Sequence, residues 1–254
     1  MPERLKKFIE DLKDNSLINS FDEARTKQGI VLPILQCLNW DIFNTDEVSP
    51  EHPAGGEVDF SLRINDVDRV FIEVKRVGWR LEQKEERQLC DYSSFKGIEL
   101  AILTNGLVWQ FYLPQLKCSW EQKIFWTINL KEQNLDDIVL KFSDFLEKEK
   151  IKGDEAIKIA EMVYEKQKRE KKIKEALPKA WDSLINEPNE LLIELVQNTT
   201  EKLCGYKPDD EQVKYFLKRS KPISPPSIIP RTDFRDRSIH SYPPGPKKKC
   251  NVLT

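Results

Sequence analysis

The chain is poor in histidine and has no closely paired cysteines, and both shortages restrict its chemistry. Only two of its 254 residues are histidine, so Ser-His, Cys-His and His-rich metal catalysis are disfavoured. Carboxylates and lysine remain as the main candidates for catalytic side chains. The five cysteines are scattered without a CxxC pair, which fits reduced thiols in a cytosol better than a disulfide framework or a zinc site.

Long apolar runs are also missing. No stretch approaches the roughly 20 residues of a membrane-spanning helix, and no apolar segment follows the basic residues near the N-terminus as a secretory signal requires. A composition of 39% hydrophobic and 33% charged residues is typical of a chain that buries a core in water. We therefore expect a cytoplasmic protein without a membrane segment. The chain also lacks the GxxxxGK[ST] phosphate loop of a nucleotide-driven motor.

The net charge of −2 hides a strong asymmetry. Residues 214–254 carry a net charge of +8, and the rest of the chain carries −10. Seven of the fifteen prolines also lie in this tail, and its few apolar residues cannot offset the entropy lost on ordering. The sequence therefore predicts a disordered, proline-rich basic tail over residues 220–254. Such an arm could contact nucleic-acid phosphates or serve only as a solubilising tail.

Residues 132–219 have the patterning of a helical region. The segment 135–146 places its apolar residues on one helical face, and the highly charged segment 166–175 predicts a solvated helix face or a nucleic-acid surface. Pro178 and Pro188 are expected to divide the remainder into shorter helices. Asp209 or Asp210 is the expected N-cap of the last helix. This region is a candidate for forming a homo-oligomer or docking a partner.

Residues 1–131 alternate between helical and extended patterns. A mixed β-sheet flanked by helices, of α+β or α/β class, follows from this order. A kink or restart is expected in the second helix, because Pro33 cannot donate a hydrogen bond to the carbonyl of Gly29. The expected elements are helices at 4–13, from Ser20 onward and at 81–95, and strands at 57–64, 69–76, 98–104, 107–113 and 125–130.

The two strands around the Asn65-Asp66 turn bring acidic residues together. Segments 57–64 and 69–76 alternate at a period of two, and their apolar faces coincide if directly paired residue numbers sum to an even number, for example Val58 with Val74. We take this example as the expected register. Asp59 then lies opposite Glu73, with Lys75 on the same face. This register requires a turn loop with an odd number of residues, or a β-bulge.

Two carboxylates directly across a sheet repel one another unless a cation lies between them. Hard oxygen ligands of this kind suit Mg²⁺ or Mn²⁺. The alternative is that Asp59, Glu73 and Lys75 are only the solvent-facing positions of an ordinary edge hairpin. The spacing alone is compatible with both interpretations.

The residues around this hairpin resemble a known nuclease family. Asp59 followed by Glu73-Val74-Lys75 resembles the PD-(D/E)XK nuclease core, and the surroundings resemble the N-terminal nuclease domain of type I restriction enzyme R subunits. The family proline before the first acid is replaced by Val58. The supporting segments, in the family's order, are Glu23-Ala24-Arg25-Thr26, Leu38-Asn39-Trp40-Asp41, Gly55-Gly56-Glu57-Val58-Asp59-Phe60, Ile72-Glu73-Val74-Lys75, Gln88-Leu89-Cys90-Asp91-Tyr92 and Leu103-Thr104-Asn105-Gly106-Leu107-Val108-Trp109.

The resemblance implies a restriction-endonuclease-like fold for residues 1–131 and a role for each matching residue. Asp59 and Glu73 are expected to hold Mg²⁺ (or Mn²⁺) with the carbonyl of Val74, and Glu23 is expected to join this metal shell. Lys75 would orient or help deprotonate the attacking water and stabilise the charge that builds on phosphorus. Gln88 and Tyr92 match the family's QxxxY motif and share one helix face. A buried tyrosine with a polar neighbour is the structural alternative for that pair.

These features predict a Mg²⁺-dependent endonuclease that hydrolyses DNA phosphodiester bonds in restriction or another defence role, with restriction-system subunits as partners. Lys75, Arg76, Arg80, Lys84, Arg87 and Arg69 are expected to place positive charge near the site. One alternative is a nuclease-fold binding or assembly module without catalysis. Another is a nuclease of the same chemistry that acts on RNA.

Overall fold

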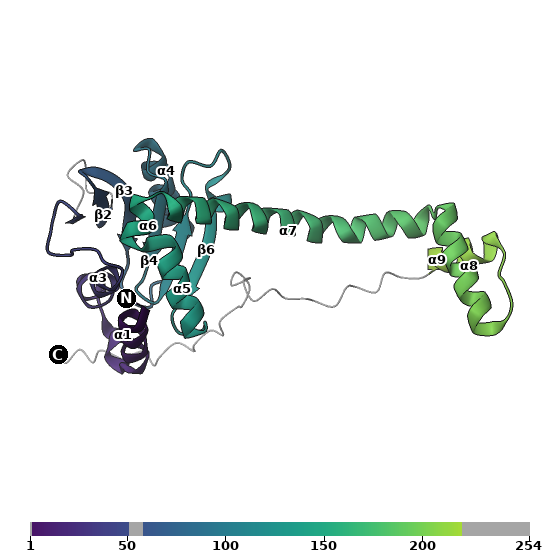
Figure 1. Cartoon of the computed structure of the whole chain (residues 1–254), viewed down its shortest axis with the longest axis horizontal. Helices are drawn as coiled ribbons and strands as arrows, with labels where there is room; N and C mark the ends of the chain where they lie inside the picture. The colour runs from purple at the N-terminus through teal and green to yellow at the C-terminus, as the bar shows by residue number, and fades with distance from the viewer. Residues whose placement is uncertain (1, 51–57, 220–254) are drawn as a thin grey trace, which may run out of the picture. The chain divides into compact units, whose positions relative to one another are not determined.

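A computed structural model describes residues 2–50 and 58–219 and contains one six-stranded mixed sheet (Figure 1). The strands follow chain order across the sheet, and every neighbouring pair is antiparallel except the parallel pair β3 and β4. The expected mixed sheet is therefore confirmed. The strands are β1 (Val48–Pro50), β2 (Phe60–Ile64), β3 (Val67–Val74), β4 (Leu100–Thr104), β5 (Val108–Tyr112) and β6 (Ile124–Asn129).

Helices cover both faces of the sheet, which explains why all five residues of β4 are buried. The helices α1 (Pro2–Asp14), α3 (Leu32–Cys37) and α5 (Leu135–Leu146) pack on one face, and α4 (Gln83–Phe95) packs on the other (Figure 1). Helix α4 belongs to the crossover that joins the parallel strands β3 and β4.

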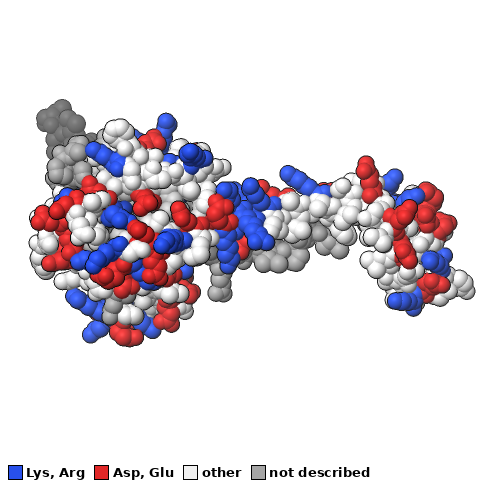
Figure 2. Space-filling model, turned by 45° about the horizontal axis from the view of Figure 1, so that its top comes forward, with Lys and Arg blue, Asp and Glu red and all other residues white. Residues whose placement is uncertain are grey.

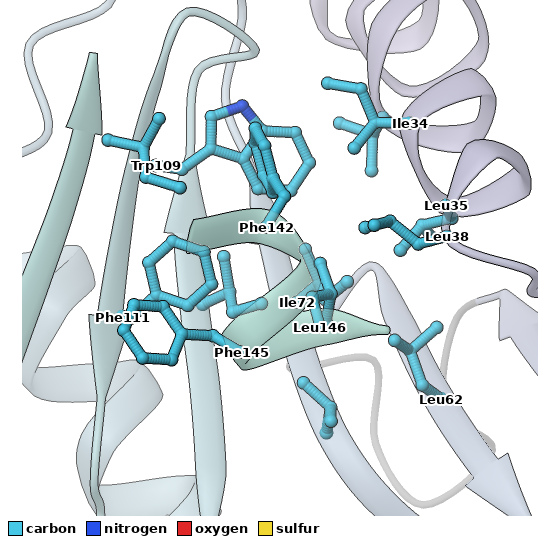
Figure 3. Packing of buried hydrophobic residues seen from close by; sticks show 14 of the residues in the cluster. Ile34, Leu35, Leu38, Leu62, Ile72, Trp109, Phe111, Phe142, Phe145 and Leu146 are labelled. Atoms are coloured by element: carbon cyan, nitrogen blue, oxygen red, sulfur yellow. The ribbon is translucent and has the colours of Figure 1, made fainter. Parts of the chain in front are cut away.

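The larger core lies between the sheet and the helices α3 and α5 (Figure 3). Phe142 of α5 meets Trp109 of β5 edge to face, with ring centroids 5.1 Å apart. The indole of Trp40, in the loop after α3, donates a hydrogen bond of 2.8 Å to the carbonyl of Leu146 at the end of α5. These contacts fix α5 to the sheet. The first compact unit extends to residue 181, so it includes helices that lie well beyond the change to purely helical structure at residue 132.

The helix that begins after Asp22 contains the expected irregularity. Asp22 caps α2 (Glu23–Thr26) by accepting a hydrogen bond of 2.8 Å from the amide of Arg25. A π-helical turn, η2 (Lys27–Val31), then leads directly into α3. Pro33 has no amide hydrogen to donate to the carbonyl of Gly29, so the regular α-helical hydrogen bonds cannot continue here. The helix instead makes a wider, π-helical turn, in which the amide of Leu32 donates to the carbonyl of Lys27, and it does not break.

The hairpin of β2 and β3 has the register expected from its apolar faces. Phe60 pairs with Ile72, which is the same register as Val58 with Val74. The required bulge lies between Leu62 and Arg63. The turn residues Asn65 and Asp66 both have positive φ, as a two-residue type I′ turn requires.

Beyond the sheet, the chain continues through helices that include one unexpected feature. Pro178 was expected to end a helix, and this prediction is wrong, because α7 runs without interruption from Glu155 to Asn186. Pro178 and the residues around it are exposed, so water can satisfy the carbonyl of Lys174 that loses its donor. The other helices are α6 (Lys148–Lys152), α8 (Glu190–Cys204) and α9 (Asp210–Arg219), with short 3₁₀ turns η1 (Ser16–Ser20) and η3 (Trp120–Gln122).

The described residues 182–219 belong to a second compact unit. Asp209 is the N-cap of α9, because its carboxylate accepts a 2.8 Å hydrogen bond from the amide of Gln212 while Gln212 bonds back to the amide of Asp209. The predicted basic tail, residues 220–254, lies outside the described residues. Among the described helices, none combines the length and apolar character needed to cross a membrane.

Gly106, in the turn between β4 and β5, is expected to tolerate no side chain. Its φ is +83°, and a Cβ atom there would lie 2.9 Å from both Ile30 Cδ1 and Thr26 Cγ2. Gly97 has a similar φ of +75°, but a Cβ atom at that position would meet no heavy atom within 4 Å. Gly106→Ala should therefore lower the free energy of unfolding by about 1–3 kcal/mol more than Gly97→Ala in urea titrations. Equal losses would contradict this close packing.

Candidate active site

Five charged side chains meet where α2 begins, β2 begins and β3 ends. We call Glu23, Lys27, Asp59, Glu73 and Lys75 the charged cluster. Glu73 and Lys75 both interact electrostatically with Asp59 and Glu23. Four of the five were expected from the sequence to lie together, and the structure brings those four together. Lys27 was not expected.

Asp59 is held against the end of β3 by the backbone. Its Oδ2 atom accepts a hydrogen bond of 2.6 Å from the amide of Val74, and its own amide donates to the carbonyl of Ile72 at 3.1 Å. The side chain is only 13% exposed. These bonds set the orientation of one carboxylate oxygen and leave Oδ1 directed at Lys27, with which it forms an ion pair.

Glu73 and Lys75 form the second ion pair, with Oε1 and Nζ 2.5 Å apart. They are two residues apart at the end of β3, so they project from the same face of the sheet. Burial, and secondly the negative charge of Asp59, raise the pKa of Glu73 from 4.5 to about 6, against the opposing effect of Lys75. The carboxyl group of Glu73 therefore keeps its proton to a higher pH than a solvated glutamate does.

The ammonium group of Lys75 is stabilised in its charged form. Burial favours the neutral amine, but the hydrogen bond to Glu73 and the negative charges of Glu73, Glu23 and Asp59 outweigh burial and raise the pKa of Lys75. A lysine that keeps its proton can orient water and stabilise developing negative charge. Of the two roles expected for Lys75, this environment supports orientation and charge stabilisation over proton removal.

Lys27 lies between two of the acids. Its Nζ is 3.0 Å from Glu23 Oε1 and is also ion-paired with Asp59. Despite partial burial, these two partners raise the pKa of Lys27. The spacing of Glu23 and Lys27, four residues apart on a helix, was the sequence signal that could have revealed the first pair. The second pair depends on how the helix packs beside the hairpin, which the sequence pattern does not show.

The acids of the charged cluster are already paired with lysines, Glu23 and Asp59 with Lys27 and Glu73 with Lys75. Among residues 2–50 and 58–219, no group of three or more His, Cys, Asp and Glu side chains lies close enough together to form a metal site. Asp59 raises the pKa of Glu73, after the larger effect of burial, and two interacting carboxylates are the kind of ligand that Mg²⁺ or Mn²⁺ prefers. Glu23 is bound to Lys27, and the carbonyl of Val74 remains a predicted ligand.

Gln88 and Tyr92 occupy different surroundings on α4. The ring of Tyr92 stacks on Phe71 of β3, with centroids 5.5 Å apart and planes 18° apart. Phe71 precedes Glu73 by two residues and faces the same side of the sheet. Gln88 is exposed beside Arg87 and Trp120, which line the same shallow surface hollow. The structure thus gives Tyr92 a packing role, and participation of Gln88 and Tyr92 in catalysis remains a prediction.

The expected positive charge near the site is only partly present. Arg69 lies near the other end of β3 and pairs with Asp154 and Glu99, so its expected place beside the site was wrong. The pairing arises because α7 begins near that end of the strand. Arg76 directly follows Lys75, and its guanidinium group lies 5.0 Å from the centre of the partly exposed Trp79 ring.

The turn after β4 supports the segment that follows Lys75. The carbonyl of Thr104 accepts a hydrogen bond of 2.7 Å from the amide of Lys75, and Asn105 Nδ2 donates to the carbonyl of Trp79 at 2.8 Å. Thr26, which is fully buried, donates its hydroxyl hydrogen bond to the carbonyl of Asp22. Thr26 and the Thr104-Asn105-Gly106 turn therefore belong to the framework that holds the segments around the charged cluster.

No protein-family model matches the chain, and no curated protein or solved structure is significantly similar to it.

The raised pKa of Glu73 has a measurable effect on stability. A carboxyl group whose pKa is higher in the folded state binds its proton more tightly there, so its contribution to stability is lost as the pH rises from 4.5 to about 6. Because glutamine does not ionise, Glu73→Gln removes this pH-dependent loss of stability. In chelator-containing buffer, the free energy of unfolding of Glu73→Gln relative to the wild type should increase by about 2 kcal/mol between roughly pH 4 and pH 8. If the difference in free energy of unfolding between Glu73→Gln and the wild type did not change with pH, burial and the charge of Asp59 would not raise the pKa of Glu73.

Proposed function

We propose that the chain is a Mg²⁺-dependent endonuclease that hydrolyses DNA phosphodiester bonds. The observation that carries the proposal is the convergence of Asp59, Glu73 and Lys75 at one end of the β2–β3 hairpin, with Asp59 tied to the backbone of Val74. These are the residues that carry the resemblance to PD-(D/E)XK nucleases. A restriction-endonuclease-like fold is part of the proposal, and the mixed sheet with helices on both faces supports it.

Each member of the site has a defined part in this reaction. Asp59 and Glu73, with the carbonyl of Val74, would hold a Mg²⁺ ion, and the bound ion would lower the pKa of a water molecule and screen the phosphate charge. Lys75 donates hydrogen bonds that orient the attacking water and stabilise the charge on the phosphorus centre. In-line attack of this water on phosphorus would break the P–O3′ bond, so that one product carries a 5′-phosphate and the other a 3′-hydroxyl that has taken up a proton. The ordered carboxylate of Asp59 reduces the reorganisation needed before attack.

The surface next to the charged cluster supports a nucleic-acid substrate. Trp79 is 38% exposed, and Arg76 lies against its ring. An aromatic face beside an arginine can stack with a base while the guanidinium group contacts phosphate. Arg76 and Trp79 follow Lys75 directly after β3, so they belong to the loop at the same end of that strand as the proposed reacting groups. Restriction or another defence process, with partner subunits, is the biological role that we propose from the resemblance.

A second candidate function is a nuclease-fold binding or assembly module without catalysis. One observation favours it: Lys27 already pairs with both Asp59 and Glu23, so part of the acidic charge is neutralised without a metal ion. In that case the cluster would stabilise the junction of α2 and the hairpin. The pKa of Glu73 is raised to about 6 even though Glu73 is paired with Lys75. This raised pKa favours the binding of a further cation.

A substrate panel distinguishes these functions. The full chain is incubated with end-labelled single- and double-stranded DNA and RNA in the presence of Mg²⁺ or Mn²⁺, with EDTA as the control. The proposal expects metal-dependent internal cuts in DNA and products that carry a 5′-phosphate. Cuts in RNA alone would assign the same chemistry to an RNA-directed nuclease. The absence of cutting in every combination by folded protein would favour the binding module.

A further inference from the structure

The loop that follows β3 carries an exposed aromatic ring beside two unpaired arginines. Trp79 is 38% exposed, and the guanidinium group of Arg76 lies 5.0 Å from the centre of its ring. Arg80 is exposed as well. Within residues 2–50 and 58–219, neither arginine forms an ion pair or a side-chain hydrogen bond. Both cations are therefore available to an anionic ligand such as a phosphate group.

Hydrogen bonds fix the backbone that carries this ring. The amide of Trp79 donates a bond of 3.1 Å to the carbonyl of Arg76, and Gly78 between them has a φ of +77°, which matches the third position of a type II turn. The carbonyl of Trp79 accepts a bond of 2.8 Å from Asn105 Nδ2. A ring on a fixed backbone loses less entropy on binding a flat ligand than a ring on a mobile loop.

The turn after β4 holds both this loop and the charged cluster. Thr104 accepts a hydrogen bond from the amide of Lys75, and its neighbour Asn105 binds the carbonyl of Trp79. Because Thr104 and Asn105 are consecutive, the backbones of Lys75 and Trp79 lie within about 12 Å of each other. One nucleotide advances a strand by about 3.4 Å in a duplex. A base bound at Trp79 is therefore only a few nucleotides from the proposed reacting groups.

The stacking surface of Trp79 selects the form of the DNA. A base can stack on the ring only if one of its own faces is uncovered. In a continuous duplex, neighbouring bases cover both faces, whereas the bases of a single strand are free to stack on aromatic side chains. Such stacking is tolerant of sequence and is typical of proteins that bind single strands.

The charge distribution is unfavourable for tight binding of a continuous duplex. Affinity for duplex DNA comes mainly from phosphates that Lys and Arg neutralise. The chain outside residues 214–254 carries a net charge of −10, and Lys27 and Lys75 are already ion-paired. On the face shown in Figure 2, acidic and basic side chains are interspersed over the sheet-containing part of the first compact unit. One ring with two free arginines is better suited to a strand that offers bases as well as phosphates.

We propose that Trp79 stacks on an unpaired base of the DNA substrate, so that the site takes single-stranded DNA in preference to continuous duplex. Arg76 and Arg80 contact the phosphates next to this base. Trp79 is a positioning residue, because the stacked base sets where the strand passes the charged cluster. This inference rests on the proposed function, since a nucleic-acid substrate is what supplies the base.

Fluorescence anisotropy of the full chain in EDTA measures binding without cleavage. The probe is a short labelled oligonucleotide, either single-stranded or annealed to its complement as a blunt duplex. The wild type is expected to bind the single strand at least about tenfold more tightly than the duplex. Phosphate contacts alone would give the opposite preference, because the duplex carries more charge per unit length.

Substitutions at Trp79 separate stacking from a merely structural role. Trp79→Ala should weaken single-strand binding about tenfold or more and leave duplex binding unchanged, whereas Trp79→Phe should stay within about threefold of the wild type, because it keeps an aromatic ring. Arg76→Gln combined with Arg80→Gln should weaken binding and reduce its salt dependence. Trp181→Ala is the matched control, because its ring on α7 is 48% exposed, and it should bind like the wild type. Circular dichroism reports whether each variant is folded.

Two results would overturn the proposal. One is a wild type that binds the duplex as tightly as the single strand, or binds neither. The other is folded Trp79→Ala that keeps wild-type affinity for the single strand, and in that case metal-dependent cutting would leave the proposed nuclease intact. Trp79-dependent binding of the single strand without any cutting in Mg²⁺ or Mn²⁺ would instead support the stacking site and refute the proposed catalysis.

Discussion

DNA cleavage by this chain is expected to fall roughly 1,000-fold or more when Glu73 is replaced by Gln or Lys75 by Met. Glu73→Gln removes one of the two carboxylates proposed to bind the metal ion, and Lys75→Met removes the ammonium group proposed to orient the water. Both side chains are about four-fifths covered, and each is the other's ion-pair partner. The measurement is single-turnover cleavage of the DNA that the wild type cuts best, at saturating Mg²⁺.

Asp144→Asn provides a matched control for these variants. Asp144 on α5 is 15% exposed, compared with 19% for Glu73, and it also forms ion pairs with lysines, Lys141 and Lys150. Its replacement removes a carboxylate of similar burial without touching the charged cluster. Wild-type rates are expected for Asp144→Asn. Metal-dependent cutting that persists in both Glu73→Gln and Lys75→Met would refute the assignment of the active site.

Divalent-cation affinity should change in opposite directions when the two partners of one ion pair are replaced. Asp59→Asn is expected to abolish measurable Mn²⁺ binding, because it removes an anionic ligand. Lys27→Met is expected to tighten Mn²⁺ binding about tenfold, because the cation no longer competes with a nearby ammonium group for Asp59. Isothermal titration calorimetry of both variants and the wild type measures the effect without requiring a substrate.

Lys141→Met is the control for Lys27→Met. Its side chain is 22% exposed, against 23% for Lys27, and it forms an ion pair with Asp144 on α5. It should leave Mn²⁺ affinity unchanged. A purely structural ion pair gives another pattern, in which Asp59→Asn and Lys27→Met both lower the melting temperature and neither affects the response to Mn²⁺. That outcome would support the binding module over the nuclease.

The hairpin shows how much of the site could be predicted without a structure. Its register follows from two local properties, the period-two alternation and the turn chemistry of Asn65-Asp66. Together those properties require a bulge, and the bulge is present. They also place Asp59 and Glu73 on the same face of the sheet. Helix content after residue 132 was equally predictable, because apolar spacing within one helix is a local property.

Other features could not be predicted because they depend on distant parts of the chain. The position of Lys27 depends on how α2 and the π-helical turn pack beside the hairpin. The pairing of Arg69 depends on where α7 begins, more than 80 residues later. Pro178 looked like a helix terminator by its own chemistry, but exposure to water on α7 reduces the cost of its missing hydrogen bond.

The sequence by itself determined that an aspartate, a glutamate and a lysine share one face of a hairpin, because side-chain alternation places them on the same side whenever the two apolar faces are aligned. Only the tertiary structure decided the electrostatic state of that face. Burial by the surrounding elements raises the pKa of Glu73, and a lysine from a separate helix neutralises part of the acidic charge. Desolvation and charge proximity are properties of packed elements, so strand periodicity cannot reveal them.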